Sequence, residues 1–405
     1  MHSSHAAEKP RLKTKRVFGS DRFIQFRNDK ENLNTMKKLG FGTMRLPLFN
    51  PDDSKTIDLE QFKKMADLFL ERGFTYFDTA YPYHEEHSEP AVREALVKRH
   101  PRDSFLLADK MPIIRVTCPE DYPRYFEEQL ERCGVDYFDY YLLHNMGRDR
   151  YVNTQKFGGF EFIQSLKKEG KVRKIGFSFH DDAETLDRIL TDHPEVDFVQ
   201  IQLNYLDWNS AVAQSGKCYE TAVKHGKKVM VMEPVKGGSL ARLPEEAMKL
   251  FEEFYKDEPV LPSPASLAIR FAASCPETKV VLSGMSSLEQ LDDNTSFMGE
   301  FNPLSGEEEK LVEQITEILN RTIRVPCTNC KYCMEECPIS VNIPEYFGLL
   351  NLHAVTGNKT NMYYQRFIMN HAKASECLKC GRCERICPQH IKIRSFLEEF
   401  AALYE

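Results

Sequence analysis

The sequence predicts an α/β protein: a (β/α)8 TIM barrel followed by a small, mainly helical C-terminal domain. Short apolar strand candidates alternate with amphipathic helix candidates, and eight such strands fit within about 260 residues. Eight of the twelve cysteines lie after residue 326, which marks a separate C-terminal domain. An open doubly wound sheet is the alternative. It is disfavoured because no G-x-G-x-x-G motif follows the first strand candidate.

The strand candidates are short runs rich in β-branched and aromatic residues. They lie at 39–42, 76–78, 105–108, 138–143, 174–178, 198–202, 228–232 and 279–282. The helix candidates between them carry apolar residues three and four positions apart, which is the spacing of an amphipathic helix. They lie at 59–72, 90–98, 125–133, 161–168, 183–191, 218–225 and 265–273.

The chain divides into four parts. Residues 1–35 are polar and contain no repeat, so we expect a disordered or loosely docked extension. The barrel is expected over residues 36–300, followed by a closing helix and linker over 301–325. Residues 326–405 then form the cysteine-rich domain, in which helices are expected at 343–352 and 361–374.

Composition narrows the function classes. The 405 residues are 41% hydrophobic and 28% charged, as in an ordinary soluble protein. A formal charge of −7 disfavours nucleic acid or an anionic membrane as a partner, because either would select a basic surface. No apolar run approaches the roughly 18 residues of a membrane span. The N-terminal stretch has no apolar core, so no secretory signal is expected.

Polar residues follow consecutive strand candidates at the end where TIM barrels carry their chemistry. Asp78 follows the second strand, and Tyr83 lies in the loop behind it. Lys110 follows the third strand and His144 the fourth. Taken singly, each has a structural explanation, such as a buried salt bridge between Asp78 and Lys110. Their occurrence at equivalent strand ends favours a catalytic group.

The segments FDTAYPYHEE, LLADK and YYLLH resemble the aldo-keto reductase family over about residues 37–300. The resemblance implies a catalytic tetrad of Asp78, Tyr83, Lys110 and His144 in an NAD(P)H-dependent oxidoreductase that reduces an aldehyde or ketone. Tyr83 would protonate the carbonyl oxygen, and we expect Lys110 to lower the pKa of this phenol. Asp78 would hold the ammonium in place. His144 would donate a hydrogen bond to the developing oxyanion.

The same resemblance implies a nicotinamide site. Ser178 and Gln202 resemble the family's carboxamide-binding residues, and Met232 stands where many members have an aromatic ring against the nicotinamide. The glycine-containing loop after the seventh strand is expected over the pyrophosphate, with an ordinary turn as the alternative. The implied cofactor-binding residues are Gly42, Thr43, Ser178, Gln202, Met232, Pro234, Lys236, Gly237, Gln290 and Asn294.

The choice between NADP(H) and NAD(H) depends on the last barrel unit. Its segment VLSGMSSLEQLDDN resembles the family's adenosine-binding segment. The Lys and Arg that many members use to bind the 2′-phosphate have no counterpart there, and this weakens the case for NADP(H). NADP(H) stays first because the family as a whole favours it.

The C-terminal cysteines repeat one spacing, C-x-x-C-x-x-C-x-x-x-C-P, with about 39 residues between the two runs. This pattern resembles bacterial two-cluster ferredoxin domains and implies two [4Fe-4S] clusters. The fourth cysteine of each run would bind the other cluster. Structural zinc or a disulfide framework would not require two four-cysteine runs that each end in Cys-Pro. The implied ligand sets are Cys327, Cys330, Cys333 and Cys387, and Cys377, Cys380, Cys383 and Cys337.

Iron held by thiolates predicts a reducing, cytoplasmic location. A nicotinamide supplies two electrons together whereas a cluster passes one, so direct coupling needs a converter such as a flavin, for which no motif is seen. Three functions stay open. The first is a reductase of a small carbonyl compound with electron-transferring or redox-coupled clusters. The second is an electron-transfer protein whose barrel docks a nicotinamide or flavin and whose clusters serve a redox partner protein. The third is a reductase with structural clusters.

Overall fold

The structure is a computed structural model that describes residues 36–50, 53–210, 213–321, 324–325, 327, 332–387 and 391–405. The expected N-terminal extension, 1–35, and the expected cluster ligand Cys330 lie outside these ranges. Within the ranges, no helix combines the length and the apolar character that crossing a membrane requires.

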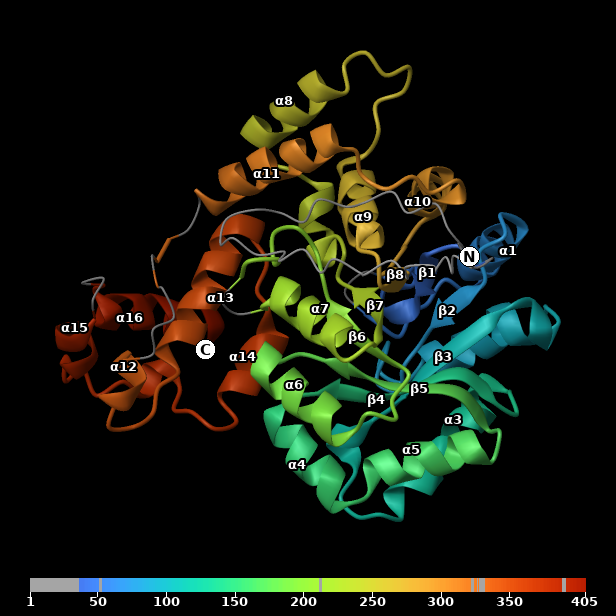
Figure 1. Ribbon diagram of the computed structural model, residues 1–405, viewed down its shortest axis with the longest axis horizontal. Helices are drawn as coiled ribbons and strands as arrows, with labels where there is room; N and C mark the ends of the chain where they lie inside the picture. Colours follow the sequence, from blue (N-terminus) through green and yellow to red (C-terminus); the bar gives the residue numbers. More distant parts are fainter. Residues whose placement is uncertain are drawn as a thin grey trace, which may run out of the picture.

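Eight parallel strands form one closed barrel in sequential order (Figure 1). The predicted TIM barrel is therefore confirmed. The rival open sheet is excluded because the first and last strands pair, with Phe41 opposite Ser283. The strands are β1 Leu39–Gly42, β2 Tyr76–Asp78, β3 Leu106–Met111, β4 Phe138–Met146, β5 Val172–Phe179, β6 Phe198–Gln202, β7 Lys228–Met232 and β8 Thr278–Ser283.

Large side chains fill the barrel interior. Tyr76, Phe198 and Met230 are buried there in one apolar cluster. Space for them is left by Gly40, where an added Cβ would lie 2.7 Å from a methyl group of Val280. Only glycine fits such a close approach, so β1 can face a filled interior without widening the barrel.

Helices surround the barrel, and several begin at side-chain caps. Asp58 caps α1 by accepting from the Gln61 N–H at 3.0 Å. Ser263 caps α9, which has proline in its first turn, a pre-organised helix start. The surrounding helices are α1 Leu59–Glu71, α2 Ser88–Val92, α3 Asp121–Cys133, α4 Arg148–Lys156, α5 Gly159–Lys168, α6 Ala183–Asp192, α7 Ser215–Lys224, α8 Glu245–Phe254, α9 Pro264–Ser274 and α10 Leu288–Gly299.

The helix expected to close the barrel is α11, Gly306–Asn320, which lies beside α8 (Figure 1). It begins with a capping box in which Ser305 and Glu308 bond each other's backbone N–H groups. Glu308 also forms an ion pair with Arg270 at 2.5 Å and accepts from the Tyr255 hydroxyl at 2.9 Å. The apolar face of α11 joins the core that surrounds the barrel, so this helix packs with the barrel.

The C-terminal domain is helical and has its own apolar core, in which Tyr346 stacks on Phe400 with ring centroids 4.7 Å apart. The helix expected over 361–374 is shorter, because α14 ends at Phe367. Ala372 forms a parallel bridge with Val341, which requires extended backbone there. The domain's helices are α12 Tyr332–Glu335, α13 Ile343–Thr356, α14 Asn361–Phe367, α15 Arg382–Ile386 and α16 Ile393–Tyr404.

Candidate active site

A cavity of about 660 Å³ opens at the carboxyl ends of the barrel strands. Ten of the fourteen predicted catalytic and cofactor-binding residues line it. They come from strands or loops at six points around the barrel, so residues far apart in the sequence share one space. The ten are Gly42, Asp78, Tyr83, His144, Ser178, Met232, Pro234, Gly237, Gln290 and Asn294.

Three of the four proposed catalytic groups meet at one ammonium. Lys110 Nζ lies 2.5 Å from Asp78 Oδ1 and 3.3 Å from the Tyr83 hydroxyl, and it donates to the Thr79 carbonyl at 2.7 Å. The His144 ring meets the Tyr83 ring edge-on, with centroids 5.8 Å apart. The Tyr83 hydroxyl therefore lies against a buried cation, and the His144 ring lies beside the Tyr83 ring at the cavity wall.

Burial raises the pKa of the Tyr83 phenol, and Lys110 offsets only part of this effect. The expectation that Lys110 would lower this pKa below its ordinary value is therefore wrong in its net direction. The sequence showed the neighbouring charge but not the desolvation. A phenol with a raised pKa keeps its proton at neutral pH, which is the state that a general acid needs.

Lys110 and His144 take opposite charge states. Burial alone would lower the pKa of Lys110, but Asp78 and Tyr83 raise it, so the ammonium stays charged. Burial lowers the pKa of His144 well below its ordinary value, and the charge of Lys110 acts in the same direction. His144 is thus a neutral imidazole at neutral pH. It can donate one hydrogen bond without adding a positive charge.

Ser178, at the carboxyl end of β5, lines the same cavity as His144. Its hydroxyl accepts from the Asn145 N–H at 2.7 Å, and both residues line the cavity. Asn145 has a positive φ of 62°, a conformation that asparagine tolerates better than most residues. This bond orients the backbone that directly follows His144.

Gln200, which the sequence reasoning missed, lines the cavity where Gln202 was expected. Its Oε1 is buried and has no hydrogen-bond partner within the described part of the chain. Gln202 has both ends of its amide engaged, since it donates to Asp207 and accepts from the Tyr363 hydroxyl. Both glutamines are on β6 and point the same way, so the period of two could not separate them.

Three more expected cofactor or catalytic residues support the cavity from behind its wall. The Thr43 hydroxyl donates to the Asp78 carbonyl at 3.0 Å, and Lys110 reaches the cavity only through its partners. Lys236 is buried in an ion pair with Asp207. That pair anchors the loop containing Gly237, which has a positive φ of 63° and does line the cavity.

Two arginines from outside the last barrel unit reach the cavity. Arg45, which follows β1, and Arg242, which follows β7, both line it. The aliphatic part of Arg45 lies against Gly284 of the last unit, where an added Cβ would be 3.1 Å from it. The last unit itself still has no counterpart of the family's phosphate-binding Lys and Arg, and the two arginines at the cavity come from outside it.

Four of the described cysteines of the C-terminal domain meet at one place. Cys337, Cys377, Cys380 and Cys383 line one small void, although Cys337 comes from the other run of the sequence. Cys333 and Cys387 are buried in the domain core, with Cys327 packed against it. No described cysteine is in a disulfide. Four sulfurs around one void fit a thiolate-ligated cluster.

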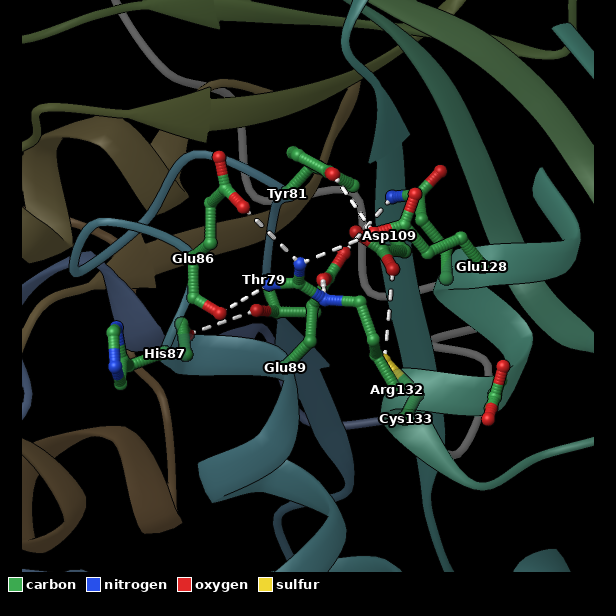
Figure 2. A network of polar contacts seen from close by, with 12 residues as sticks. Thr79, Tyr81, Glu86, His87, Glu89, Asp109, Glu128, Arg132 and Cys133 are labelled. Carbon is green, nitrogen blue, oxygen red and sulfur yellow. Dashed lines mark hydrogen bonds and ion pairs between the residues drawn. The ribbon is translucent and has the colours of Figure 1, made fainter. Parts of the chain in front are cut away.

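A separate group of acids lies behind β3, where Glu89, Asp109 and Cys133 meet (Figure 2). All three are fully buried. The three ligand atoms lie within 4.8 Å of one another, but Arg132 Nε is 2.5 Å from Glu89 and balances one charge. Cys133 Sγ donates to Asp109 Oδ2 at 3.6 Å. Burial and the nearby Glu89 raise the pKa of Asp109 well above its ordinary range, so Asp109 is the protonated member.

Replacing Asp109 with asparagine should change how stability depends on pH. Asp109 has a higher pKa in the folded than in the unfolded protein. Its contribution to the free energy of unfolding therefore falls as pH rises above about 4. The variant loses this dependence. Each unit of pKa shift corresponds to about 1.4 kcal/mol, so thermal unfolding at pH 5 and pH 8 should show the variant gaining on the wild type at pH 8. The matched control is exposed Asp103→Asn, which should track the wild type at both values. If the difference in thermal stability between Asp109→Asn and wild type is the same at pH 5 and pH 8, Asp109 is not the protonated residue.

In a comparison with known proteins, each of the two parts of the chain matches a family or domain profile. The aldo/keto reductase family profile matches residues 38–317, and a 4Fe-4S dicluster domain profile matches residues 326–391. The NADH-specific methylglyoxal reductase of Escherichia coli (strain K12) is 26% identical over 229 residues, which are 51% of this chain and 66% of that protein. The glyoxal reductase of Bacillus subtilis (strain 168) is 43% identical over 53 residues, 13% of this chain and 17% of that protein.

These matched stretches span less than two thirds of either curated relative. Among solved structures, the holo form of an aldo-keto reductase from Bacillus halodurans is similar, with a TM-score of 0.54 and 24% identity. The matched region covers 69% of this chain and 91% of the Bacillus halodurans chain. At this identity the likeness concerns the fold alone.

Proposed function

Because this chain belongs to the aldo/keto reductase family and ends in a 4Fe-4S dicluster domain, we propose that it is an NAD(P)H-dependent oxidoreductase that reduces an aldehyde or ketone. The observation that carries the proposal is the contact of the Tyr83 hydroxyl with the buried Lys110–Asp78 ion pair, at a cavity large enough for a cofactor and a substrate.

The residues at the cavity fit a nicotinamide. Gln200 offers a buried carbonyl oxygen that has no partner among the described residues, which suits the N–H donors of a carboxamide. Ser178 lines the same region, and the polarisable thioether of Met232 offers an apolar surface for a flat ring. A bound nicotinamide would supply the hydride that reduces the carbonyl carbon.

The protein's own groups handle the oxygen of the carbonyl. Tyr83 donates its proton to that oxygen as negative charge develops there. Lys110 stabilises the phenolate that remains, and Asp78 keeps the ammonium in place. Neutral His144 donates a hydrogen bond to the oxygen and orients the carbonyl.

For the nucleotide, we propose NADP(H), with NAD(H) as the alternative. Arg45 and Arg242 at the cavity supply cations that a 2′-phosphate requires. Gln290 lies nearby and accepts from the Ser286 N–H at 2.7 Å. The methylglyoxal reductase relative is NADH-specific, which keeps the alternative open. A side-by-side KM comparison of NADPH and NADH decides between them.

The C-terminal cysteines would hold two [4Fe-4S] clusters that serve electron transfer or redox coupling. The second candidate function, electron transfer to a partner protein without a carbonyl substrate, is disfavoured because all four proposed catalytic groups are brought together at the barrel mouth. The domain contacts the mouth directly: Asn358, which follows α13, donates to the Ser239 hydroxyl at 3.1 Å. This contact supports a placement of the C-terminal domain against the cavity-bearing end of the barrel.

An anaerobic titration of the iron-loaded protein tests this function. NADPH with methylglyoxal should be consumed in a carbonyl-dependent reaction. NADPH alone should bleach cluster absorption near roughly 400 nm if the clusters are coupled, and FMN should be added in a parallel series. Carbonyl reduction without bleaching in either series would make the clusters structural. Bleaching without reduction of any carbonyl in a panel of aldehydes and ketones would favour the electron-transfer protein and overturn the proposal.

A further inference from the structure

The void that Cys337, Cys377, Cys380 and Cys383 line is close to the surface of the C-terminal domain. Cys380 is itself exposed. Leu378 also lines the void, and it is 61% exposed although its side chain is apolar. A cluster bound by these four cysteines therefore lies where another protein can approach it.

Four exposed basic side chains accompany Cys380 in the same part of the domain. Two of them pair with a glutamate at 2.7 Å, and the other two form no ion pair in the part of the chain that the structure describes. The paired side chains are Lys379 and Arg394, and the unpaired ones are Arg382 and Arg385. Together with Leu378, these four residues form the basic face. Its charge is opposite to that of the whole chain, which has a formal net charge of −7.

Gly381, the residue after Cys380, brings two guanidinium groups to the edge of the void. Its positive φ of 71° is a conformation that glycine adopts without strain. A Cβ at Gly381 would lie 3.8 Å from Arg385 Nη1 and 3.7 Å from Arg394 Cζ, so both guanidinium groups lie beside this residue. Arg394 and Gly381 also line the void. Positive charge thus borders the thiolates near the exposed Cys380.

The basic face lies on the side of the domain that points away from the barrel. Figure 1 shows α15, which carries Arg382 and Arg385, at the outer edge of the domain. The opposite side of the domain docks on the barrel, where Met362 of α14 lines the active-site cavity and Tyr363 donates to Gln202. A second protein can therefore reach the basic face while the domain stays docked.

We infer that the basic face is the docking site of an acidic electron-carrier protein, which exchanges single electrons with the cluster bound at this void. A charged rim around an apolar centre is a common composition of protein interfaces, and Leu378 supplies the apolar centre. Opposite charges steer two such proteins together, and the interfaces of electron-transfer complexes are small. One electron crosses the interface in each encounter, so the carrier is oxidised as the cluster is reduced, or the reverse. This inference rests on the electron-transfer role proposed for the clusters and not on carbonyl reduction.

Charge compensation within the domain is the alternative role of these cations. Four thiolates outweigh the positive charge of a [4Fe-4S] core, and nearby cations would balance the excess. Arg394 suits that role because it lines the void, whereas Arg382 and Arg385 are exposed and are not part of the lining. If these two arginines only balanced the cluster, their loss would change its reduction potential and leave the binding of another protein unchanged.

Two small one-electron carriers of opposite charge test the inference. The iron-loaded protein is titrated in a calorimeter with a plant-type [2Fe–2S] ferredoxin, which is acidic, and with a cytochrome c, which is basic. The ferredoxin should bind and the cytochrome c should not. The screening length of exposed charges falls from about 30 Å at 0.01 M to about 8 Å at 0.15 M ionic strength. Ferredoxin binding should therefore weaken at least about 10-fold over this range.

Arg382→Gln combined with Arg385→Gln should weaken ferredoxin binding about 10-fold or more, with iron content unchanged. The matched control is Lys249→Gln combined with Lys256→Gln. It removes two positive charges from side chains of the barrel part that are 71% and 56% exposed. This control should bind the ferredoxin as the wild type does.

Binding of both carriers, binding of neither, or equal ferredoxin binding by the arginine variant and the wild type would overturn the inference. A short single-stranded oligonucleotide is titrated in parallel. If it binds as tightly as the ferredoxin and loses binding in the same variant, the basic face binds polyanions in general, which also overturns the inference. Carbonyl-dependent NADPH oxidation is measured on the same samples and should be equal in all of them. If no carbonyl is reduced while ferredoxin binding follows the expected pattern, the proposed reductase function fails and the docking site stands.

Discussion

Replacing Tyr83 with phenylalanine is expected to lower carbonyl reduction by roughly 10²- to 10⁴-fold, the usual contribution of a positioned general acid. The substitution removes one hydroxyl and leaves the ring, so its edge-on contact with His144 persists. Lys110 keeps its bonds to Asp78 and to the Thr79 carbonyl. Folding and iron content should therefore match the wild type.

The pH profile adds a second readout for Tyr83. Because the pKa of Tyr83 is raised, the phenol stays protonated through neutral pH, and the rate of reduction should fall only on the alkaline side. The residual activity of Tyr83→Phe should lack this alkaline limb. The matched control is Tyr81→Phe: Tyr81 is two residues away, and its hydroxyl donates to Glu128 at 2.9 Å, away from the cavity lining. Turnover by Tyr83→Phe at the Tyr81→Phe rate would remove Tyr83 from the mechanism.

Replacing Lys110 with methionine should destabilise the fold and abolish reduction together. The Lys110 and Asp78 side chains are 0% and 3% exposed, so the variant leaves a carboxylate buried without its counter-charge. Removing one partner of a buried ion pair costs about 3–5 kcal/mol in the free energy of unfolding. The Tyr83 phenolate would also lose its neighbouring cation. Denaturant unfolding and initial rates measure the two effects separately.

A double variant separates stability from catalysis. Asp78→Asn combined with Lys110→Met removes both charges, so it should recover much of the lost free energy of unfolding while reduction stays abolished. Lys98→Met is the control at an exposed pair, since Lys98 and Glu94 are 52% and 42% exposed. Its cost should be below about 1 kcal/mol. A Lys110→Met cost as small as that of Lys98→Met would show that the buried pair contributes nothing to stability.

The elements that sequence reasoning located well are those defined by local pattern. Strand β7 was expected at 228–232 and lies at Lys228–Met232, because a buried strand is recognisable from its own apolar run. Asp78, Tyr83 and His144 were expected at one cavity and line it. The parallel barrel rule brings the carboxyl ends of all strands to one face, so strand order alone predicted this meeting.

Where sequence reasoning failed, the reason is that the answer depends on tertiary contacts. Gln200 and Gln202 have the same strand parity, and only the contact of Tyr363 with Gln202 shows which amide is already engaged. Arg45 reaches the cavity because β1 closes against β8, which joins positions more than two hundred residues apart. The sign of the Tyr83 pKa shift depends on desolvation, which requires the surrounding atoms to be placed.

The sequence by itself determined the barrel, the catalytic candidates and the two cysteine runs, because each is encoded by local periodicity or by fixed spacing between a few residues. Only the tertiary structure decided that Met362 of α14, from the C-terminal domain, lines the active-site cavity of the barrel. No local pattern carries that information. The docking of one domain on another is set by complementary surfaces whose residues are scattered along the chain.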